Sequence, residues 1–215
     1  MSKTINIKES VYARNEKQAE ELNKTLTEKG IFCVNVLGAP GVGKTTTLLQ
    51  ILKTLESPAA VIEGDIESDI DTQKLKSLGF PAVQINTGGA CHLDAPVVAD
   101  VFAELSFSDG FLFIENIGNL VCPVQYLLGE HIKLLICAVT DGSDKPYKYP
   151  AAFEKADIIL LNKCDLLNYI NFDMEFFING ISKLNPEVPV FMVSAETGDG
   201  FDEVIQWLQK RAHTV

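Results

Sequence analysis

Apolar residues gather in short runs along the chain, and polar or charged segments separate one run from the next. Most of the runs show no alternation of apolar and polar positions, which is typical of strands buried on both faces of a parallel sheet. Each run has the length of a single strand. The runs are residues 31–37, 59–62, 82–85, 111–114, 134–139, 158–161 and 188–193.

The segments between these runs carry helical patterns. Residues 11–29 place apolar side chains among charges at roughly helical spacing, and Gly30 is a typical end for such a helix. Strands that alternate with helices predict a three-layer α/β fold with a mostly parallel sheet flanked by helices. The other predicted helices are residues 45–55, 70–78, 95–104, 172–184 and 201–212.

The chain length indicates one domain, and the net charge argues against some classes of partner. The chain has 215 residues, enough for one α/β core and too short for two. Residues 1–30 are expected to form a helical lead-in that is part of the same domain as residues 31–215. The formal net charge of −11 argues against nucleic acid and anionic lipid as partners. The sequence shows no signal-peptide pattern and no run long enough to cross a membrane, so a cytoplasmic protein is expected.

The segment after the first apolar run fits a phosphate-binding loop. Residues 38–45 read GAPGVGKT and match GxxxxGK(S/T) at every fixed position, between a predicted strand and a predicted helix. The glycines let the backbone N–H groups face phosphate oxygens, and the helix N-terminus adds partial positive charge. We expect Lys44 to reach the β- and γ-phosphates and the Thr45 hydroxyl to bind Mg²⁺. The predicted phosphate contacts are Gly38, Gly41, Val42, Gly43, Lys44, Thr45 and Thr46.

Acidic side chains that follow two other runs are candidate ligands of the magnesium ion. Glu115 directly follows the run at residues 111–114, in the form of a Walker B element. Glu115 and Gly118 also have the acidic-x-x-Gly spacing in which the glycine N–H senses the γ-phosphate. Asp65 is a second candidate, whereas Glu67, Asp69 and Asp71 fit a solvated face and receive no role. The predicted catalytic residues are Lys44, Thr45, Asp65 and Glu115.

The preferred base is indicated by an N-K-x-D motif after the run at residues 158–161. The carboxylate of Asp165 can accept hydrogen bonds from guanine N1–H and its exocyclic amine, which adenine does not offer. The Lys163 stem can cover the base, and Asn162 can tie the loop to the phosphate side. Ser194 and Ala195 fit the companion S-A-x element that supports the base. The combination predicts GTP rather than ATP.

Three sulfur and nitrogen side chains suggest a second metal site. Cys91 and His92 are adjacent after a glycine-rich loop, and Cys122 lies just beyond Gly118. Thiolate and imidazole are ligands that Zn²⁺ and Ni²⁺ prefer. Spacing alone fits two interpretations equally well. One is a metal site, and the other is three unconnected residues, in which the two cysteines are small buried hydrophobes. Three ligands from one chain leave a fourth position for water, substrate or a second subunit. The remaining cysteines are expected to be structural: Cys33, Cys137 and Cys164.

Taken together, these motifs resemble those of the HypB family, GTPases that help to insert nickel into nickel-iron hydrogenase. The resemblance covers nearly the whole chain and implies a SIMIBI-type P-loop NTPase fold, with a GTPase domain over residues 31–215. It implies that Cys91, His92 and Cys122 bind nickel or zinc at the interface of a GTP-dependent homodimer. It also implies two partners, a HypA-like nickel metallochaperone and the precursor of the hydrogenase large subunit. The matching segments are residues 38–46, 61–65, 88–95, 115–123 and 162–165.

The chain departs from the family pattern in two places. Many relatives carry an N-terminal cysteine motif or histidine-rich stretch, but residues 1–30 contain neither Cys nor His, so nickel storage there is not expected. Ala39 and Pro40 occupy the region where the wider class often has a second lysine. Stabilisation of charge by such a lysine from a partner subunit is therefore not assumed.

The sequence does not identify the residue that positions the attacking water. No glutamine follows Gly118, and Asn119 in that place is a candidate for positioning water.

The expected function is a GTP-hydrolysing metallochaperone, a switch that delivers nickel during hydrogenase maturation. Cys122 lies a few residues past the γ-phosphate sensor, so the GTP and GDP states should place it differently relative to Cys91 and His92. One alternative is a urease-accessory nickel GTPase, whose metal motif is a compact Cys-Pro-His that His92 and Cys122 do not form. A second alternative is a small-molecule kinase with the same phosphate-binding loop, but this function would not explain the guanine-reading N-K-x-D motif. A passive metal-binding protein with a weak GTPase is the third alternative.

Overall fold

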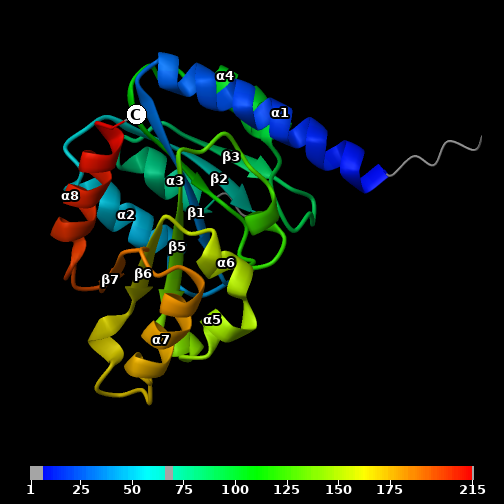
Figure 1. The fold of residues 1–215 in the computed structure, drawn as a ribbon. Helices are drawn as coiled ribbons and strands as arrows, with labels where there is room; N and C mark the ends of the chain where they lie inside the picture. The colour runs from blue at the N-terminus through cyan, green and yellow to red at the C-terminus, as the bar shows by residue number, and fades with distance from the viewer. Residues whose placement is uncertain (1–6, 66–69, 215) are drawn as a thin grey trace, which may run out of the picture.

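The computed structural model describes residues 7–65 and 70–214, without the side chains of residues 7–10 and of Asp65. Its centre is a seven-stranded sheet in the order β3-β2-β4-β1-β5-β6-β7, and every pairing within it is parallel (Figure 1). Each predicted apolar run is confirmed as a strand, with ends that move by a few residues. The strands are β1 (Ile31–Gly38), β2 (Ala59–Asp65), β3 (Ala82–Asn86), β4 (Gly110–Glu115), β5 (Ile132–Ala138), β6 (Ile158–Asn162) and β7 (Val190–Met192).

Helices connect the successive strands except β4 and β5, which a loop with a short 3-10 turn at Pro123–Gln125 joins, and all six predicted helices are present. Asp94 and Asp173 set the starts of α4 and α7, because their side chains accept hydrogen bonds from Val97 N and Phe176 N at 3.1 and 2.9 Å. The prediction missed two short helices between β5 and β6. The helices are α1 (Ile7–Glu28), α2 (Lys44–Thr54), α3 (Ile70–Ser77), α4 (Ala95–Glu104), α5 (Lys145–Lys148), α6 (Pro150–Glu154), α7 (Met174–Leu184) and α8 (Phe201–Ala212).

The helices cover both faces of the sheet and give the three predicted layers. Alternate side chains of β1 enter opposite layers, since Val34 packs with residues of α2 and α8 while Cys33 packs with residues of α1 and α4. Helices α6 and α7 cover the remaining part of the second face, around Phe153 and Phe177. In Figure 1, α1 runs along α4, and α8 lies beside α2.

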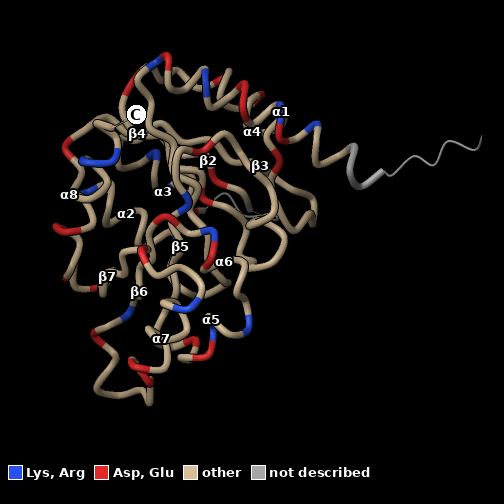
Figure 2. The backbone as a smooth tube through the Cα atoms, viewed as in Figure 1, with Lys and Arg blue, Asp and Glu red and all other residues tan. Residues whose placement is uncertain are grey.

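The N-terminal helix α1 packs by one side and carries charges on the other. Leu22 and Leu26 are buried against the sheet. Its outer face holds Lys17–Glu21 and Lys24–Glu28 pairs one turn apart, each at 3.8 Å, and Figure 2 shows acidic and basic positions interspersed along it. None of the helices in residues 7–65 and 70–214 is both long and apolar enough to span a bilayer.

The parallel arrangement decides where the functional residues meet. All seven strands end at the same edge of the sheet, and β1 has neighbours reached by opposite crossovers, β4 on one side and β5 on the other. Crevices at such a reversal of strand order are the usual ligand sites of open α/β sheets. The loops after β1, β4 and β6 therefore converge there, and these loops carry the predicted nucleotide motifs.

Candidate functional site: a nucleotide cleft beside a cysteine–histidine cluster

The loop between β1 and α2 has the backbone shape that the phosphate motif predicts. Gly41 and Gly43 adopt φ of 79° and 91°, a region that disfavours L side chains. A Cβ on Gly43 would also lie 2.7 Å from Asn162 Nδ2. Helix α2 begins at Lys44 without a side-chain cap. Its first N–H groups therefore have no side-chain cap as acceptor, and a phosphate in the loop can accept from them.

Thr45 and Glu115 meet at the start of α2, as the magnesium prediction requires. The Thr45 hydroxyl lies 2.8 Å from Glu115 Oε1 and 3.1 Å from Asp71 Oδ2. Glu115 Oε2 is buried and has no hydrogen-bond partner within the described part of the chain. A cavity of about 280 Å³ opens beside them, lined also by Lys44 and Gly118. Oxygen donors with an orphaned buried carboxylate oxygen fit Mg²⁺, which Thr45 and Glu115 would hold.

Two further acidic residues belong to this cavity. The prediction of a solvated face is wrong for Asp71, which reaches Thr45 from the first turn of α3. Glu63 is buried in β2, receives a hydrogen bond from the Thr72 hydroxyl, and is in register with Glu115 of β4. The sequence signal that identifies Glu63 as a candidate site residue is its position as a carboxylate within an otherwise apolar strand. Residues 67 and 69 and the side chain of the predicted ligand Asp65, whose backbone ends β2, lie outside the described part.

Burial raises the pKa of Glu115 from its ordinary 4.5 to about 7. The Thr45 hydrogen bond and Lys44 lower the pKa, while Glu63 and Asp71 raise it. Between these pH values the folded protein retains a proton that the unfolded chain has lost. Without Mg²⁺, the free energy of unfolding should therefore fall as pH rises through this window, by up to about 3 kcal/mol.

Urea unfolding in EDTA at pH 5 and pH 7.5 measures this dependence. A Glu115→Gln variant carries no titrating group there, so we expect it to match the wild type at pH 5 and to be more stable at pH 7.5. Glu175→Gln, a change at an exposed acid of α7, is the control and should follow the wild type. Parallel pH profiles for wild type and Glu115→Gln would contradict the assignment.

The N-K-x-D loop after β6 is tied to the phosphate loop as predicted. Asn162 Nδ2 donates to Val42 O at 2.9 Å, and Asn162 Oδ1 accepts from Ala195 N at 3.0 Å. Lys163 adopts φ of 63°, and its Nζ donates to Gly41 O at 2.6 Å. The two nucleotide motifs, more than a hundred residues apart in the chain, thus form one wall.

Asp165 stands in the cavity that suits the base. The Ser194 hydroxyl donates to Asp165 Oδ1 at 2.7 Å and thereby orients the carboxylate. The cavity measures about 330 Å³ and is also lined by Thr46, Lys163 and Ala195. It adjoins the phosphate loop at Gly43. The arrangement places a fixed acceptor where the predicted guanine edge would lie.

The predicted switch segment after Glu115 touches both the phosphate loop and the cysteine–histidine loop. A Cβ on Gly118 would lie 3.1 Å from the Pro40 side chain, and Asn119 forms an isolated bridge with Gly38. The Asn119 amide donates to Cys91 O at 3.5 Å, and its Oδ1 accepts from Val121 N at 2.8 Å. The Asn119 side chain, the candidate for positioning water, thus contacts backbone groups on both of its ends in this structure.

The structure brings the predicted metal residues together in pairs. Cys91 Sγ lies 3.5 Å from His92 Nδ1. The neighbouring Cys122 thiol raises the pKa of Cys91 through a hydrogen bond, and burial adds to the shift. Burial lowers the pKa of His92, which favours the neutral, metal-binding form. Among the described residues, however, no three such side chains already form a metal-binding group. Cys91 is exposed and Cys122 is half-buried, whereas Cys33 and Cys137 are buried, as expected of structural thiols, and Cys164 is half-buried.

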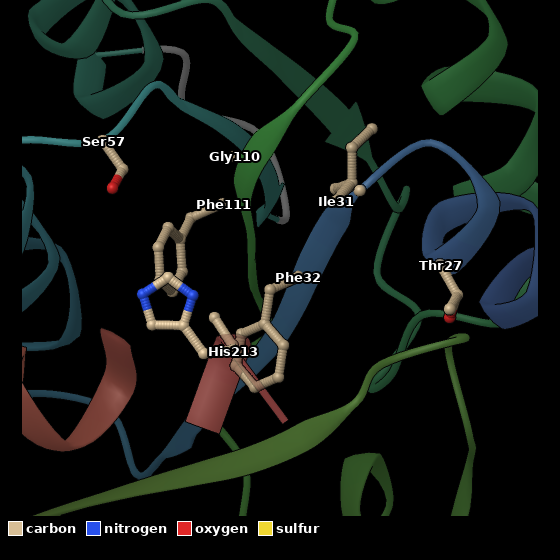
Figure 3. A pocket seen from close by; sticks show the side chains of 9 residues that line it. Thr27, Ile31, Phe32, Ser57, Gly110, Phe111 and His213 are labelled. Atoms are coloured by element: carbon tan, nitrogen blue, oxygen red, sulfur yellow. The ribbon is translucent and has the colours of Figure 1, made fainter. Parts of the chain in front are cut away.

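A further cavity, of about 220 Å³, lies at the opposite edge of the sheet (Figure 3). Gly110 and Ile31 there are the first residues of β4 and β1, and the walls include the rings of Phe32, Phe111 and His213. It lacks the carboxylates and the glycine loop that nucleotide chemistry requires. The carboxyl edge of the sheet is therefore the candidate site.

Comparisons with known proteins agree with this geometry. The family model described as "CobW/HypB/UreG, nucleotide-binding domain" matches residues 32–192. The chain is 43% identical over 213 residues to the hydrogenase maturation factor HypB of Azotobacter chroococcum mcd 1, covering 98% of this chain and 70% of that protein. A crystal structure of HypB from Helicobacter pylori in complex with nickel superposes with a TM-score of 0.90 at 32% identity, covering 94% of this chain and 96% of the other. HypB from Archaeoglobus fulgidus gives a TM-score of 0.85 at 34% identity, with coverages of 93% and 99%.

Proposed function

Because the chain belongs to the CobW/HypB/UreG family, within its HypB hydrogenase maturation factors, we propose that it is a GTP-hydrolysing switch that delivers nickel to a nickel-iron hydrogenase. GTP is its substrate and the nickel ion its cargo. Cys91, His92 and Cys122 are the proposed cargo ligands, and zinc has the same donor preference.

The nucleotide cleft supports hydrolysis of GTP to GDP and phosphate. Lys44 supplies a positive charge for the β- and γ-phosphates, and Asp165 selects guanine. Thr45 and Glu115, which lie within hydrogen-bond distance of each other, would hold Mg²⁺, and this ion would supply neutralisation of charge on the phosphate oxygens. The backbone N–H groups of the loop orient the phosphates in a fixed geometry, so little reorganisation is needed during the reaction.

The observation that carries the proposed switch is the contact from Asn119 to Cys91. Asn119 follows Gly118, the predicted γ-phosphate sensor, and its side chain donates to Cys91 O at 3.5 Å. The same segment continues to Cys122. Loss of the γ-phosphate would move Gly118 and thereby change how Cys122 stands relative to Cys91. A metal that prefers one of these arrangements must favour the matching nucleotide by the same factor.

A nickel titration in the presence of GDP and of a non-hydrolysable GTP analogue tests this function. We expect the two Ni²⁺ dissociation constants to differ by about 5-fold to 150-fold, the usual range of such coupling. Substitution of Cys91, His92 and Cys122 by Ala should remove the nucleotide-sensitive site. Equal dissociation constants would contradict the switch, and an unchanged nickel stoichiometry in the Ala variants would contradict the ligand assignment.

The proposed partners follow from nickel delivery. A HypA-like metallochaperone and the precursor of the hydrogenase large subunit would exchange nickel with this chain in the cytoplasm. A GTP-dependent homodimer is proposed at the cysteine–histidine cluster. Exposed apolar side chains near that cluster support such an interface, with Val121 57%, Leu127 40% and Val97 40% exposed. Mass measurement by light scattering with each nucleotide tests the dimer.

A further inference from the structure

We infer that Tyr126 is a positioning residue for His92, and that helix α1 holds it in place through Tyr12 and Asn15. The inference rests on the proposed metal site and assigns a role in it to three residues that are not ligands. It gives α1, which contributes no ligand of its own among residues 11–28, a part in metal binding.

The first observation is a ring stack at the proposed ligand. The His92 and Tyr126 rings lie 3.8 Å apart between centroids with 19° between their planes. Tyr126 also contacts Tyr12 of α1, with centroids 5.0 Å apart. An imidazole binds a metal through a nitrogen lone pair in the plane of the ring. A ring held flat against Tyr126 cannot turn freely about its side-chain bonds, so the direction of that lone pair is fixed.

The second observation is a buried amide that fastens both partners of the stack. Asn15 is only 4% exposed. Its Nδ2 donates to Leu127 O at 2.8 Å, and its Oδ1 accepts from Ala95 N at 2.8 Å. Leu127 is the residue after Tyr126, and Ala95 is the third residue after His92. One side chain of α1 therefore fixes the backbone on both sides of the stack.

The third observation is the glycine-rich loop that precedes His92. Gly88 and Gly89 adopt φ of 58° and 95°, and the loop lies between β3 and α4 without strand pairing. A loop of this composition does not define the direction of a side chain by itself. The stack is also not core packing. His92 and Tyr126 remain partly exposed at the rim of a cavity of about 280 Å³, which Asn15 also lines.

Two substitutions at one position test the stack in the full-length chain. We expect Tyr126→Phe to bind Ni²⁺ within about twofold of the wild type, because it retains the ring. Tyr126→Ala should weaken Ni²⁺ binding by about 10-fold to 100-fold, the usual cost of losing a residue that orients a ligand. It should also alter the thiolate-to-nickel charge-transfer band in the near-ultraviolet spectrum, and leave GTP hydrolysis without nickel unchanged.

A matched control is available elsewhere on the surface. Tyr147 stacks on Phe176 with centroids 4.3 Å apart and the same 19° between planes, and α5 and α7 carry this pair. Tyr147→Ala removes an equivalent stack and should leave nickel affinity and spectrum unchanged. Asn15→Leu should weaken nickel binding in the same direction as Tyr126→Ala. If Asn15→Leu does not fold, the Tyr126 pair still decides the question.

Each outcome separates this inference from the proposed function. If the wild type binds nickel through Cys91, His92 and Cys122 but Tyr126→Ala has the same affinity and spectrum, the positioning role is wrong. If Tyr126→Phe loses as much affinity as Tyr126→Ala, the hydroxyl rather than the stack acts, and the assignment is overturned. If the wild type does not bind nickel through the cysteine–histidine cluster, the proposed function fails and this inference fails with it.

Discussion

An Asp165→Asn variant is expected to lose at least about a hundredfold in affinity for GTP and to gain affinity for xanthosine triphosphate. The carboxylate of Asp165 can accept from two guanine donors, N1–H and the exocyclic amine. An asparagine in its place turns one acceptor into an amide donor, which then faces a donor of the base. A site built to hydrogen-bond one group rejects a mismatch strongly, because buried polar groups are left unpaired. Xanthine carries a carbonyl in place of the exocyclic amine and would pair with the new amide.

The Asp165→Asn substitution should leave the orientation of the side chain unchanged. The Asn side chain keeps an oxygen that can accept from the Ser194 hydroxyl, which lies 2.7 Å from Asp165 Oδ1. Its orientation should therefore persist, so the effect reports on the base and not on a disordered loop. Competition among GTP, xanthosine triphosphate and ATP for a fluorescent nucleotide measures the preference.

The control is the same substitution at a helix cap. Asp173 accepts from Phe176 N at 2.9 Å at the start of α7, and asparagine caps helices about as well as aspartate. Asp173→Asn should leave nucleotide preference unchanged. An Asp165→Asn variant that still prefers GTP over xanthosine triphosphate would mean that another residue reads the base.

The strands and the two nucleotide motifs were predictable because their signals are local. A buried parallel strand appears as an apolar run, and each of the seven runs became a strand. Helices α5 and α6 were missed for a physical reason. They have four and five residues, and each has a proline in its first turn, so neither is long enough to show helical periodicity.

The composition of the site was less predictable, because it depends on contacts between distant segments. Glu63 comes next to Glu115 only through the register of β2 and β4, and Asp71 reaches Thr45 only because the fold brings the first turn of α3 to the start of α2. Asn15 contacts residues 80 and 112 positions away along the chain. Sequence motifs specify the chemistry within one loop, whereas packing decides which second loop completes it.

A Lys44→Ala variant is expected to lower the rate of GTP hydrolysis by about a hundredfold to a thousandfold. Phosphoryl transfer depends on positioning and on charge stabilisation, and removal of one preorganised donor commonly costs a factor of about 10²–10³. Lys44 Nζ lies 3.3 Å from Ala39 O, so its charge is already held over the loop that would bind the phosphates. Alanine is a good helix former at the first position of α2, and the fold should remain intact.

Lys53→Ala, at an exposed lysine of the last turn of α2, is the control and should hydrolyse GTP like the wild type. The same pair of variants separates a switch from a passive metal-binding protein. Lys44→Ala should still bind nickel, because Lys44 is not among the proposed cargo ligands, yet it should fail to support hydrogenase maturation in cells that lack their own factor. Full maturation with Lys44→Ala would contradict the switch and favour passive metal binding, whereas loss of maturation with retained nickel binding would show that delivery of the metal requires the GTP cycle.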